Sequence, residues 1–202
     1  MGDPPTEHLE TELKFDVSLD FVVPDLSGVV GASGVTEPEV RLLTASYFDT
    51  ADLRLAAAKI TLRRRTGGPD AGWHLKLPKS AGTRRELQVP LDASATAVPA
   101  QLGTLVSDQV GDEPLQVVAV LETHRTVRNI TDPGGAILAE VADDQVTGRV
   151  PGREPATWRE IEVELVSGGP EVLAAARSRL TAAGARPSDA PSKLARVLSR
   201  ST

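Results

Sequence analysis

Acidic and basic side chains recur at every second residue in this sequence, which is the spacing of one face of a β-strand. Late in the chain, Glu160, Glu162 and Glu164 alternate with apolar residues, and Arg63 and Arg65 do so much earlier in it. Mg²⁺ and Mn²⁺ prefer carboxylate oxygens as ligands, whereas the forked guanidinium group of arginine matches phosphate oxygens. The two kinds of face together predict a phosphoryl-transfer site that binds metal ions beside phosphate.

Three further segments have a charged face of the same kind. Their residues are His74 and Lys76; Arg84, Glu86 and Gln88; and Glu140 and Asp144. An ordinary sheet with one core face and one solvated face explains each strand by itself. It does not explain why the acids lie towards both ends of the chain and the bases in the middle strands. A closed barrel explains this, because charges that line a wet interior can compensate one another and bind ions.

The elements that would position these residues are mostly strands, separated by breaks that contain Gly, Pro, Asp and Asn. Eight strands are predicted, at Glu7–Val17, Arg41–Phe48, Lys59–Arg65, Gly72–Leu77, Arg84–Leu91, Leu115–Ile130, Ala136–Val146 and Thr157–Val166. Helices are predicted at Pro99–Val110, Pro170–Ala183 and Ser192–Ser199. The predicted fold is therefore mainly β with a few helices (α+β), an eight-stranded antiparallel closed β-barrel with a charged interior.

Composition limits the class of protein. The 202 residues are 40% hydrophobic and 25% charged, which predicts one folded domain over residues 7–202 after a flexible tail over residues 1–6. A net charge of −6 argues against a nucleic-acid partner, whose phosphates need a basic surface. The chain has no cysteine, no apolar run of the roughly 20 residues that span a bilayer, and no signal-peptide pattern, so a cytoplasmic protein without a membrane partner is expected.

A series of short charged motifs runs through the chain, beginning with Glu10-Thr-Glu12-Leu-Lys14. In chain order, the others are Tyr47-Phe-Asp49-Thr50 with Leu53-Arg-Leu55, Thr61-Leu62-Arg63-Arg-Arg65, His74-Leu-Lys76, Arg84-Arg-Glu86, His124-Arg125-Thr-Val-Arg128, Ala139-Glu140-Val-Ala-Asp143-Asp144, Glu160-Ile-Glu162-Val-Glu164-Leu165 and Ser192-Lys193-Leu-Ala-Arg196. This series resembles the CYTH domain of the triphosphate tunnel metalloenzymes, whose ExExK signature matches the first motif. The resemblance covers nearly the whole chain.

The resemblance implies a tunnel that hydrolyses a triphosphate with the help of Mg²⁺ or Mn²⁺. By position, the implied phosphate-binding residues are Lys14, Arg63, Arg65, Lys76, Arg84, Arg125 and Lys193. The implied metal ligands are Glu10, Glu12, Asp144, Glu162 and Glu164. Among all these, Glu12 and Lys76 are also implied to act in catalysis, together with Glu86.

Several charged residues near these motifs stay open at this point. His74 either donates to a phosphate or moves a proton, or it is a structural histidine whose hydrogen bonds are satisfied. Strict alternation places Arg85 and Arg128 on the opposite face from their neighbours, so each enters the tunnel only through a bulge. His8 and His124 are predicted to be surface residues.

Three functions remain open within the family. The favoured one is an inorganic triphosphatase, and the second is another CYTH activity, either thiamine triphosphatase or class IV adenylate cyclase. The third is a module that binds triphosphate or polyphosphate without turnover. The last motif and the Glu140–Asp144 segment resemble CYTH domains that precede a helical CHAD domain. This implies a domain of a longer protein with a CHAD partner, as a monomer or a homodimer.

Overall fold

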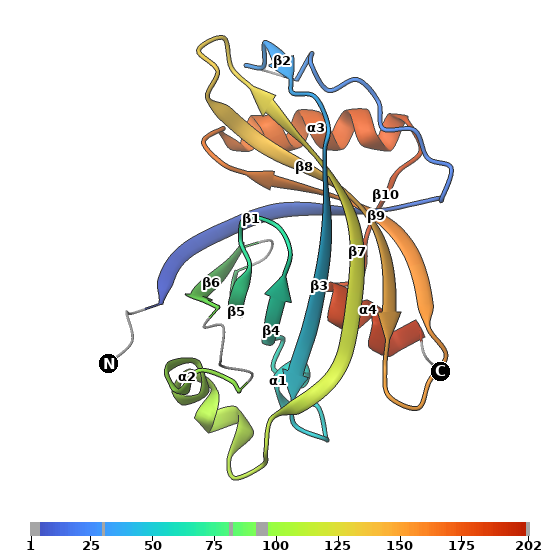
Figure 1. The fold of residues 1–202 in the computed structure, drawn as a ribbon. Helices are drawn as coiled ribbons and strands as arrows, with labels where there is room; N and C mark the ends of the chain where they lie inside the picture. The colour runs from blue at the N-terminus through green and yellow to red at the C-terminus, as the bar shows by residue number, and fades with distance from the viewer. Residues whose placement is uncertain (1–4, 30, 81–82, 92–96, 201–202) are drawn as a thin grey trace.

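The computed structural model describes residues 5–29, 31–80, 83–91 and 97–200, and its centre is a closed barrel of strands (Figure 1). The barrel strands are β1 (Thr6–Val17), β3 (Glu39–Asp49), β4 (Thr61–Thr66), β5 (Gly72–Ser80), β6 (Thr83–Pro90), β7 (Gln116–Thr131), β8 (Ile137–Arg149) and β9 (Ala156–Leu165). They pair in the order β1-β6-β5-β4-β3-β7-β8-β9, β9 pairs back to β1, and every pair is antiparallel. The predicted eight-stranded antiparallel barrel is therefore confirmed.

Strand β1 closes the barrel because its two halves pair with different neighbours. Residues 6–11 pair with β6, and residues 12–17 pair with β9. The short strand β10 (Arg186–Pro187) adds two pairs at Phe15 and Asp16. Of the predicted N-terminal tail, residues 1–4 lie outside the described residues, and Thr6 is already the first residue of β1.

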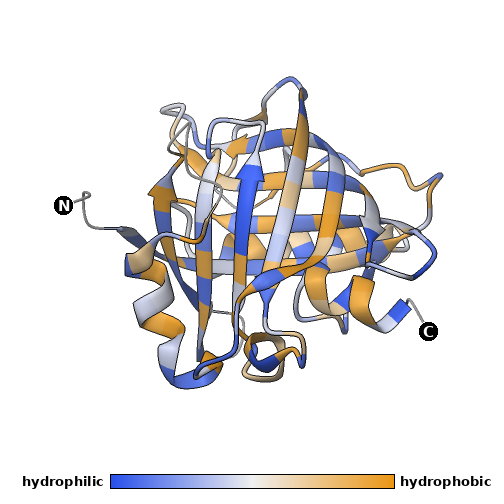
Figure 2. Ribbon diagram, turned by 60° about the horizontal axis from the view of Figure 1, so that its bottom comes forward, coloured by the Kyte–Doolittle hydropathy of each residue, from blue (hydrophilic) through white to orange (hydrophobic). Residues whose placement is uncertain are grey.

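The apolar core lies outside the barrel wall, between the strands and the helices. Helix α3 (Pro170–Ala182) packs with Phe15, and α4 (Lys193–Arg200) packs with Trp158. Helix α2 (Ala100–Val110) packs in the same way with Trp73 and Leu62. Figure 2 shows the hydrophobic and hydrophilic residues that alternate along the strands. Because the apolar side chains face outward, the interior is left to charged ones.

The three predicted helices are present, and the chain contains two short elements that were not predicted, besides β10. These are β2 (Gly34–Val35), which pairs with β7, and the one-turn helix α1 (Arg54–Ala57). In the described part of the chain, no helix is both long and apolar enough to cross a membrane.

The turn around α1 corrects one predicted strand. Asp49 is fully buried, and its carboxylate accepts hydrogen bonds from the backbone N–H groups of Thr50 (2.7 Å), Leu55 (2.9 Å) and Ala56 (2.9 Å). These bonds hold a turn in which Lys59 has a positive φ of 61°. Strand β4 therefore begins at residue 61, and the predicted strand Lys59–Arg65 was wrong at its first two residues.

Candidate active site in the barrel interior

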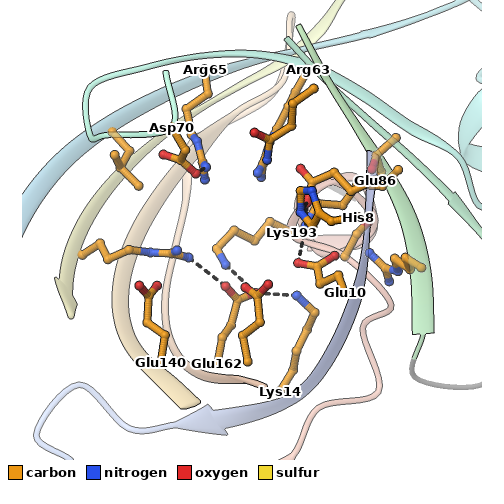
Figure 3. Close-up of a pocket in the computed structure, with 18 of the residues that line it drawn as sticks. His8, Glu10, Lys14, Arg63, Arg65, Asp70, Glu86, Glu140, Glu162 and Lys193 are labelled. Atoms are coloured by element: carbon orange, nitrogen blue, oxygen red, sulfur yellow. Dashed lines mark hydrogen bonds and ion pairs between the residues drawn. The ribbon is translucent and has the colours of Figure 1, made fainter. Parts of the chain in front are cut away.

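The barrel interior contains a cavity of about 250 Å³ whose lining is mostly charged (Figure 3). The predicted site residues that line it are Glu10, Lys14, Arg63, Arg65, Lys76, Arg84, Glu86, Arg125, Glu162, Glu164 and Lys193. Glu12 lines an adjoining cavity of about 540 Å³, and the two cavities share Lys14, Thr61, Arg84 and Ser192. Asp144 lines neither cavity and is fully buried behind the first.

Arg63 and Arg65 of β4, which we call the basic wall, point into the first cavity (Figure 3). The Nε atom of each is buried, without a hydrogen-bond partner among the described residues. Arg65 forms an ion pair with Asp70, yet burial and the nearby guanidinium groups of Arg63 and Arg125 lower its pKa to about 9. Burial is outweighed at Arg63, whose pKa is raised, so it is at Arg65 that the basic wall is short of negative charge, as expected of a site for an anion.

Glu10 and Glu12 of β1 and Glu164 of β9 form what we call the acidic wall. Glu12 and Glu164 are directly opposite in the β1–β9 ladder. One oxygen of Glu10, Oε1, lies 2.5 Å from Lys76 Nζ, whereas Oε2 is buried without a partner among the described residues. Burial raises the pKa of Glu164 to about 7, and the carboxylates of Glu10 and Glu12 contribute to the rise. Glu12 pairs with Lys14 at 3.0 Å, so it is at Glu164 that the acidic wall is short of positive charge.

A second group of carboxylates surrounds the ammonium group of Lys193, which α4 inserts into the barrel. Lys193 Nζ lies 2.9 Å from Asp144 Oδ2, 2.7 Å from Glu160 Oε1 and 2.8 Å from Glu162 Oε1. Arg125 donates to both oxygens of Asp144, at 2.8 and 2.7 Å, and to Glu162 Oε2 at 2.7 Å. We call Lys193 and its three carboxylates the central cage.

The central cage carries the one tight group of possible metal ligands found among the described residues. Its three carboxylates already surround an ammonium group that occupies the middle of the group. Although burial opposes ionisation, these carboxylates raise the pKa of Lys193 well above its ordinary value. For the same reason, burial is outweighed at Glu162, where Lys14, Lys193 and Arg125 hold the pKa well below its usual range.

Glu86 is the centre of a third group, which includes a histidine that the sequence left open. His74 Nδ1 lies 2.6 Å from Glu86 Oε1, and His74 Nε2 donates to the Asp70 carbonyl oxygen at 2.9 Å. Both ring nitrogens of this buried histidine are therefore engaged, which favours the structural alternative. On the other side, Glu86 Oε2 lies 3.2 Å from His8 Nε2 and 3.5 Å from Lys76 Nζ.

Sequence reasoning left several residues of the cavity lining out of the site, among them the charged or titratable His8, Arg41 and Asp70. His8 was expected to be a surface residue, although it precedes Glu10 by two positions and so shares its strand face. Asp70 lies in the turn between β4 and β5, where no periodicity indicates a direction. Arg85 behaves as strict alternation predicts, because it pairs with the exposed Glu7 at 2.7 Å.

Residues 8–197, which include every strand described above except the first two residues of β1, match the CYTH domain. The chain belongs to the CYTH family. Two uncharacterized proteins of Mycobacterium tuberculosis, from strains CDC 1551 and H37Rv, are each 44% identical to this CYTH domain over 209 residues. The match covers 96% of this chain, which spans 41% of the length of these relatives.

Solved structures share the fold of this CYTH domain at low sequence identity. A putative adenylate cyclase from Bacillus halodurans superposes with a TM-score of 0.65 at 19% identity, covering 94% of this chain and 97% of that one. A putative adenylyl cyclase from Hippeastrum, described as having a dominant triphosphatase activity, has a TM-score of 0.55 at 23% identity, covering 96% and 97%. These likenesses support the barrel architecture.

Proposed function

We propose that this CYTH domain hydrolyses inorganic triphosphate in its barrel interior with the help of Mg²⁺ or Mn²⁺. The proposal rests on an imbalance of charge that has opposite signs on the two walls. Arg65 of the basic wall is short of negative charge and Glu164 of the acidic wall is short of positive charge, and both side chains line the same cavity. A triphosphate with a divalent cation supplies both charges at once, which fits the donor sets of the two walls.

Phosphate binding is assigned to the cations that reach the cavity. Arg63 and Arg65 offer forked donors from β4. The other assigned phosphate ligands are Lys14, Lys76, Arg84, Arg125 and Lys193. The last two also bind carboxylates of the central cage, so they hold the site together while they face the ligand.

The acidic wall fits a hard divalent cation. Glu10 Oε2 is buried without a hydrogen-bond partner among the described residues, and Glu164 has a pKa of about 7. A bound cation would give the first a partner and would stabilise the ionised form of the second. Glu12 completes this set and has one cation partner, Lys14 at 3.0 Å, whereas Asp144 and Glu162 join it only by giving up several contacts with cations of the protein. When bound, the metal ion would neutralise phosphate charge and activate the attacking water.

The proposed reaction breaks one P–O bond of the triphosphate and forms another to the oxygen of water, whose protons end on phosphate and diphosphate. We assign to Glu12 and Glu86 the task of orienting that water, whose proton passes to a phosphate oxygen, because nearby cations outweigh burial and hold the pKa of both carboxyls below the ordinary value. Lys76 lies 2.5 Å from Glu10 and 3.5 Å from Glu86. From this position its ammonium group would offset charge on the transferred phosphoryl group.

The adjoining cavity favours a second candidate, hydrolysis or cyclisation of an organic triphosphate, as in a thiamine triphosphatase or a class IV adenylate cyclase. Apolar side chains such as Leu13, Ile60 and Leu194 line this larger space, which shares four lining residues with the first cavity. An organic group attached to the triphosphate would find apolar surface there. A module that binds polyphosphate without turnover is less well supported, because the acidic wall would have no use in it.

Phosphate release tests the proposal directly. Inorganic triphosphate, ATP and thiamine triphosphate are each incubated with the protein in Mg²⁺, Mn²⁺ or EDTA. Metal-dependent release from inorganic triphosphate is the expected result, and a preference for ATP or thiamine triphosphate would favour the second candidate. Tight calorimetric binding of triphosphate without release under any condition would refute catalysis and support the binding module.

The domain organisation, localisation and partners of the protein are also proposals. We propose that residues 7–202 form one domain of a longer cytoplasmic protein with a C-terminal CHAD domain and no nucleic-acid or membrane partner. The greater length of the mycobacterial relatives supports this. Light scattering on the purified full-length protein would distinguish a monomer from a homodimer.

A further inference from the structure

Asp70 is a carboxylate at the edge of the first cavity that no step of the proposed reaction uses. Its side chain is 40% exposed and forms an ion pair with Arg65, whose own side chain is only 7% exposed. The other carboxylates that line this cavity, among the described residues, all lie on strands. Asp70 instead lies in the turn between β4 and β5, at the end of the basic wall.

We propose that Asp70 is an internal competitor of the substrate, a carboxylate that pairs with Arg65 and that a phosphate group must displace to bind there. The inference rests on the proposed function, because it takes Arg65 as a phosphate ligand. It makes Asp70 a specificity-determining residue. An anion that binds Arg65 must interact with it strongly enough to offset the loss of the Asp70–Arg65 ion pair, so only a strongly charged ligand occupies that position.

Competition follows from the surroundings of Arg65. Its guanidinium group is buried beside the cations Arg63 and Arg125 and therefore needs an anion. Asp70 supplies one in the protein itself, and a phosphate group would supply another to the same donors. The forked guanidinium group binds one such anion on a given pair of N–H groups, so the two exclude each other.

The turn that carries Asp70 is fixed, so the exchange involves the side chain. The buried His74 donates to the Asp70 carbonyl oxygen at 2.9 Å and is itself held by Glu86 at 2.6 Å. Gly67 has a φ of 78°, and a Cβ added to it would lie 2.0 Å from the Leu42 carbonyl oxygen. The backbone is therefore closely packed against β3 on one side and anchored on the other. Rotation of the exposed carboxylate towards solvent is enough to free Arg65.

This exchange has a consequence for product release. When diphosphate or phosphate begins to leave Arg65, the Asp70 carboxylate returns to the guanidinium group and excludes the product. Asp70 therefore weakens the binding of substrate and of products that use Arg65 by the same factor. Its removal should lower KM and strengthen product inhibition together, which a residue with a merely structural role would not do.

The test compares Asp70→Asn with Glu7→Gln. Both variants remove one negative charge, but Glu7 pairs with Arg85 at 2.7 Å on the outer face of the barrel. Calorimetry measures the Kd of inorganic triphosphate and of diphosphate, and initial rates give KM. Asp70→Asn should tighten both ligands about tenfold, which is the expected size for relief of one unfavourable charge contact at a partly exposed site. Glu7→Gln should change them less than about twofold.

The double variant Asp70→Asn with Arg65→Gln should lose the gain, because the competitor acts only through Arg65. Weaker binding by a folded Asp70→Asn protein would overturn the inference. An equal gain in triphosphate affinity in Asp70→Asn and in Glu7→Gln would overturn it as well. Asp70→Ser serves as a second replacement, and melting temperatures establish folding for each protein. If the wild-type protein binds no triphosphate, the proposed function fails; if it binds and Asp70→Asn binds equally, only the role of Asp70 fails.

Discussion

Two groups of carboxylates lie in the same barrel and differ in the source of their positive charge. In the central cage, three carboxylates surround the ammonium group of Lys193, and Arg125 binds two of them as well. In the acidic wall, two of the three carboxylates pair with lysines, whereas Glu164 forms no ion pair among the described residues and burial raises its pKa to about 7. Both groups thus contain clustered carboxylates, and they differ in how fully cations of the protein neutralise them.

This difference in charge compensation distinguishes carboxylates that stabilise the fold from carboxylates that are available to bind a ligand. A carboxylate that the protein itself neutralises is part of the packing, since breaking the pair leaves a buried charge behind. A carboxylate that the protein leaves uncompensated has a reason to bind an external cation. The central cage therefore holds α4 to the barrel, whereas the acidic wall is where we expect metal ions.

The largest expected effect is the loss of the central cage. Lys193→Met leaves three buried carboxylates without their ammonium group, which should lower the free energy of unfolding by about 3–5 kcal/mol. Urea denaturation followed by circular dichroism measures it. Lys59→Met is the matched control, because Lys59 is exposed in the turn after α1. A loss of less than about 1 kcal/mol in Lys193→Met would contradict a structural role for the cage.

Removal of a carboxylate from the acidic wall should affect turnover instead. Glu12→Gln should reduce metal-dependent hydrolysis about 10²- to 10³-fold, because several kcal/mol of metal-assisted stabilisation are lost. Triphosphate affinity without metal should stay within about threefold of wild type, and stability should fall less than in Lys193→Met, because Lys14 loses Glu12 but keeps Glu162 as a partner. Rates in Mg²⁺ and Mn²⁺ together with calorimetry in EDTA check both parts. Unchanged metal-dependent rates would refute the metal role of Glu12.

Substitution of an arginine in the basic wall should weaken the binding of triphosphate. Arg63→Gln removes a charged donor from the cavity and should weaken triphosphate binding about 10- to 100-fold, since hydrogen bonds to charged groups contribute about 1.5–3 kcal/mol. Lys76→Ala should act in the same direction. Calorimetry gives the Kd, and thermal unfolding separates lost affinity from lost structure. Arg85→Gln on the outer face is the control, and a variant that merely unfolds with normal residual affinity would make Arg63 structural.

The period-2 patterns predicted each of these walls, because alternation along a strand determines which side chains share a face. Arg63 and Arg65 were assigned to the charged interior from spacing alone and line the cavity, whereas the Glu10–Lys14 motif was assigned through the family resemblance. The same rule would have found His8, two residues before Glu10. Periodicity also predicted the hydrophobic outer faces on which the helices pack.

Contacts across the barrel were not predictable in this way. Lys193 reaches carboxylates of β8 and β9 from a helix that follows them, so its partners depend on how the chain closes in space. The Lys59 error has a similar origin, because the buried side chain of Asp49 holds a turn that local alternation does not reveal. Which acids are compensated, and which are left to bind metal, is therefore a property of the tertiary structure.

The smallest expected effect is a difference in pH dependence between the two carboxylate groups. The pKa of Glu164 is raised by burial, from an ordinary value of 4.5 to about 7. Between these values the folded protein holds a proton that the unfolded chain has released, so stability falls as the pH rises. In EDTA, we expect a loss of about 1–2 kcal/mol between pH 5 and 7.5 from this group.

The central cage should respond with the opposite sign. The neighbouring cations outweigh burial and hold the pKa of Glu162 well below its ordinary value, so its contribution is complete above pH 4.5 and is lost as the pH falls through that lowered pKa. Burial also lowers the pKa of His74 to about 4, which makes stability rise with pH over the same range, so the acidic wall is measured by the difference between the wild-type protein and Glu164→Gln in urea denaturation from pH 5 to 7.5. Glu164→Gln should remove the falling contribution and keep the rise from His74, and saturating Mg²⁺ should do the same in the wild-type protein by replacing the proton. The same pH dependence in both proteins would mean that another group holds the proton, and the acidic wall would then be compensated like the cage.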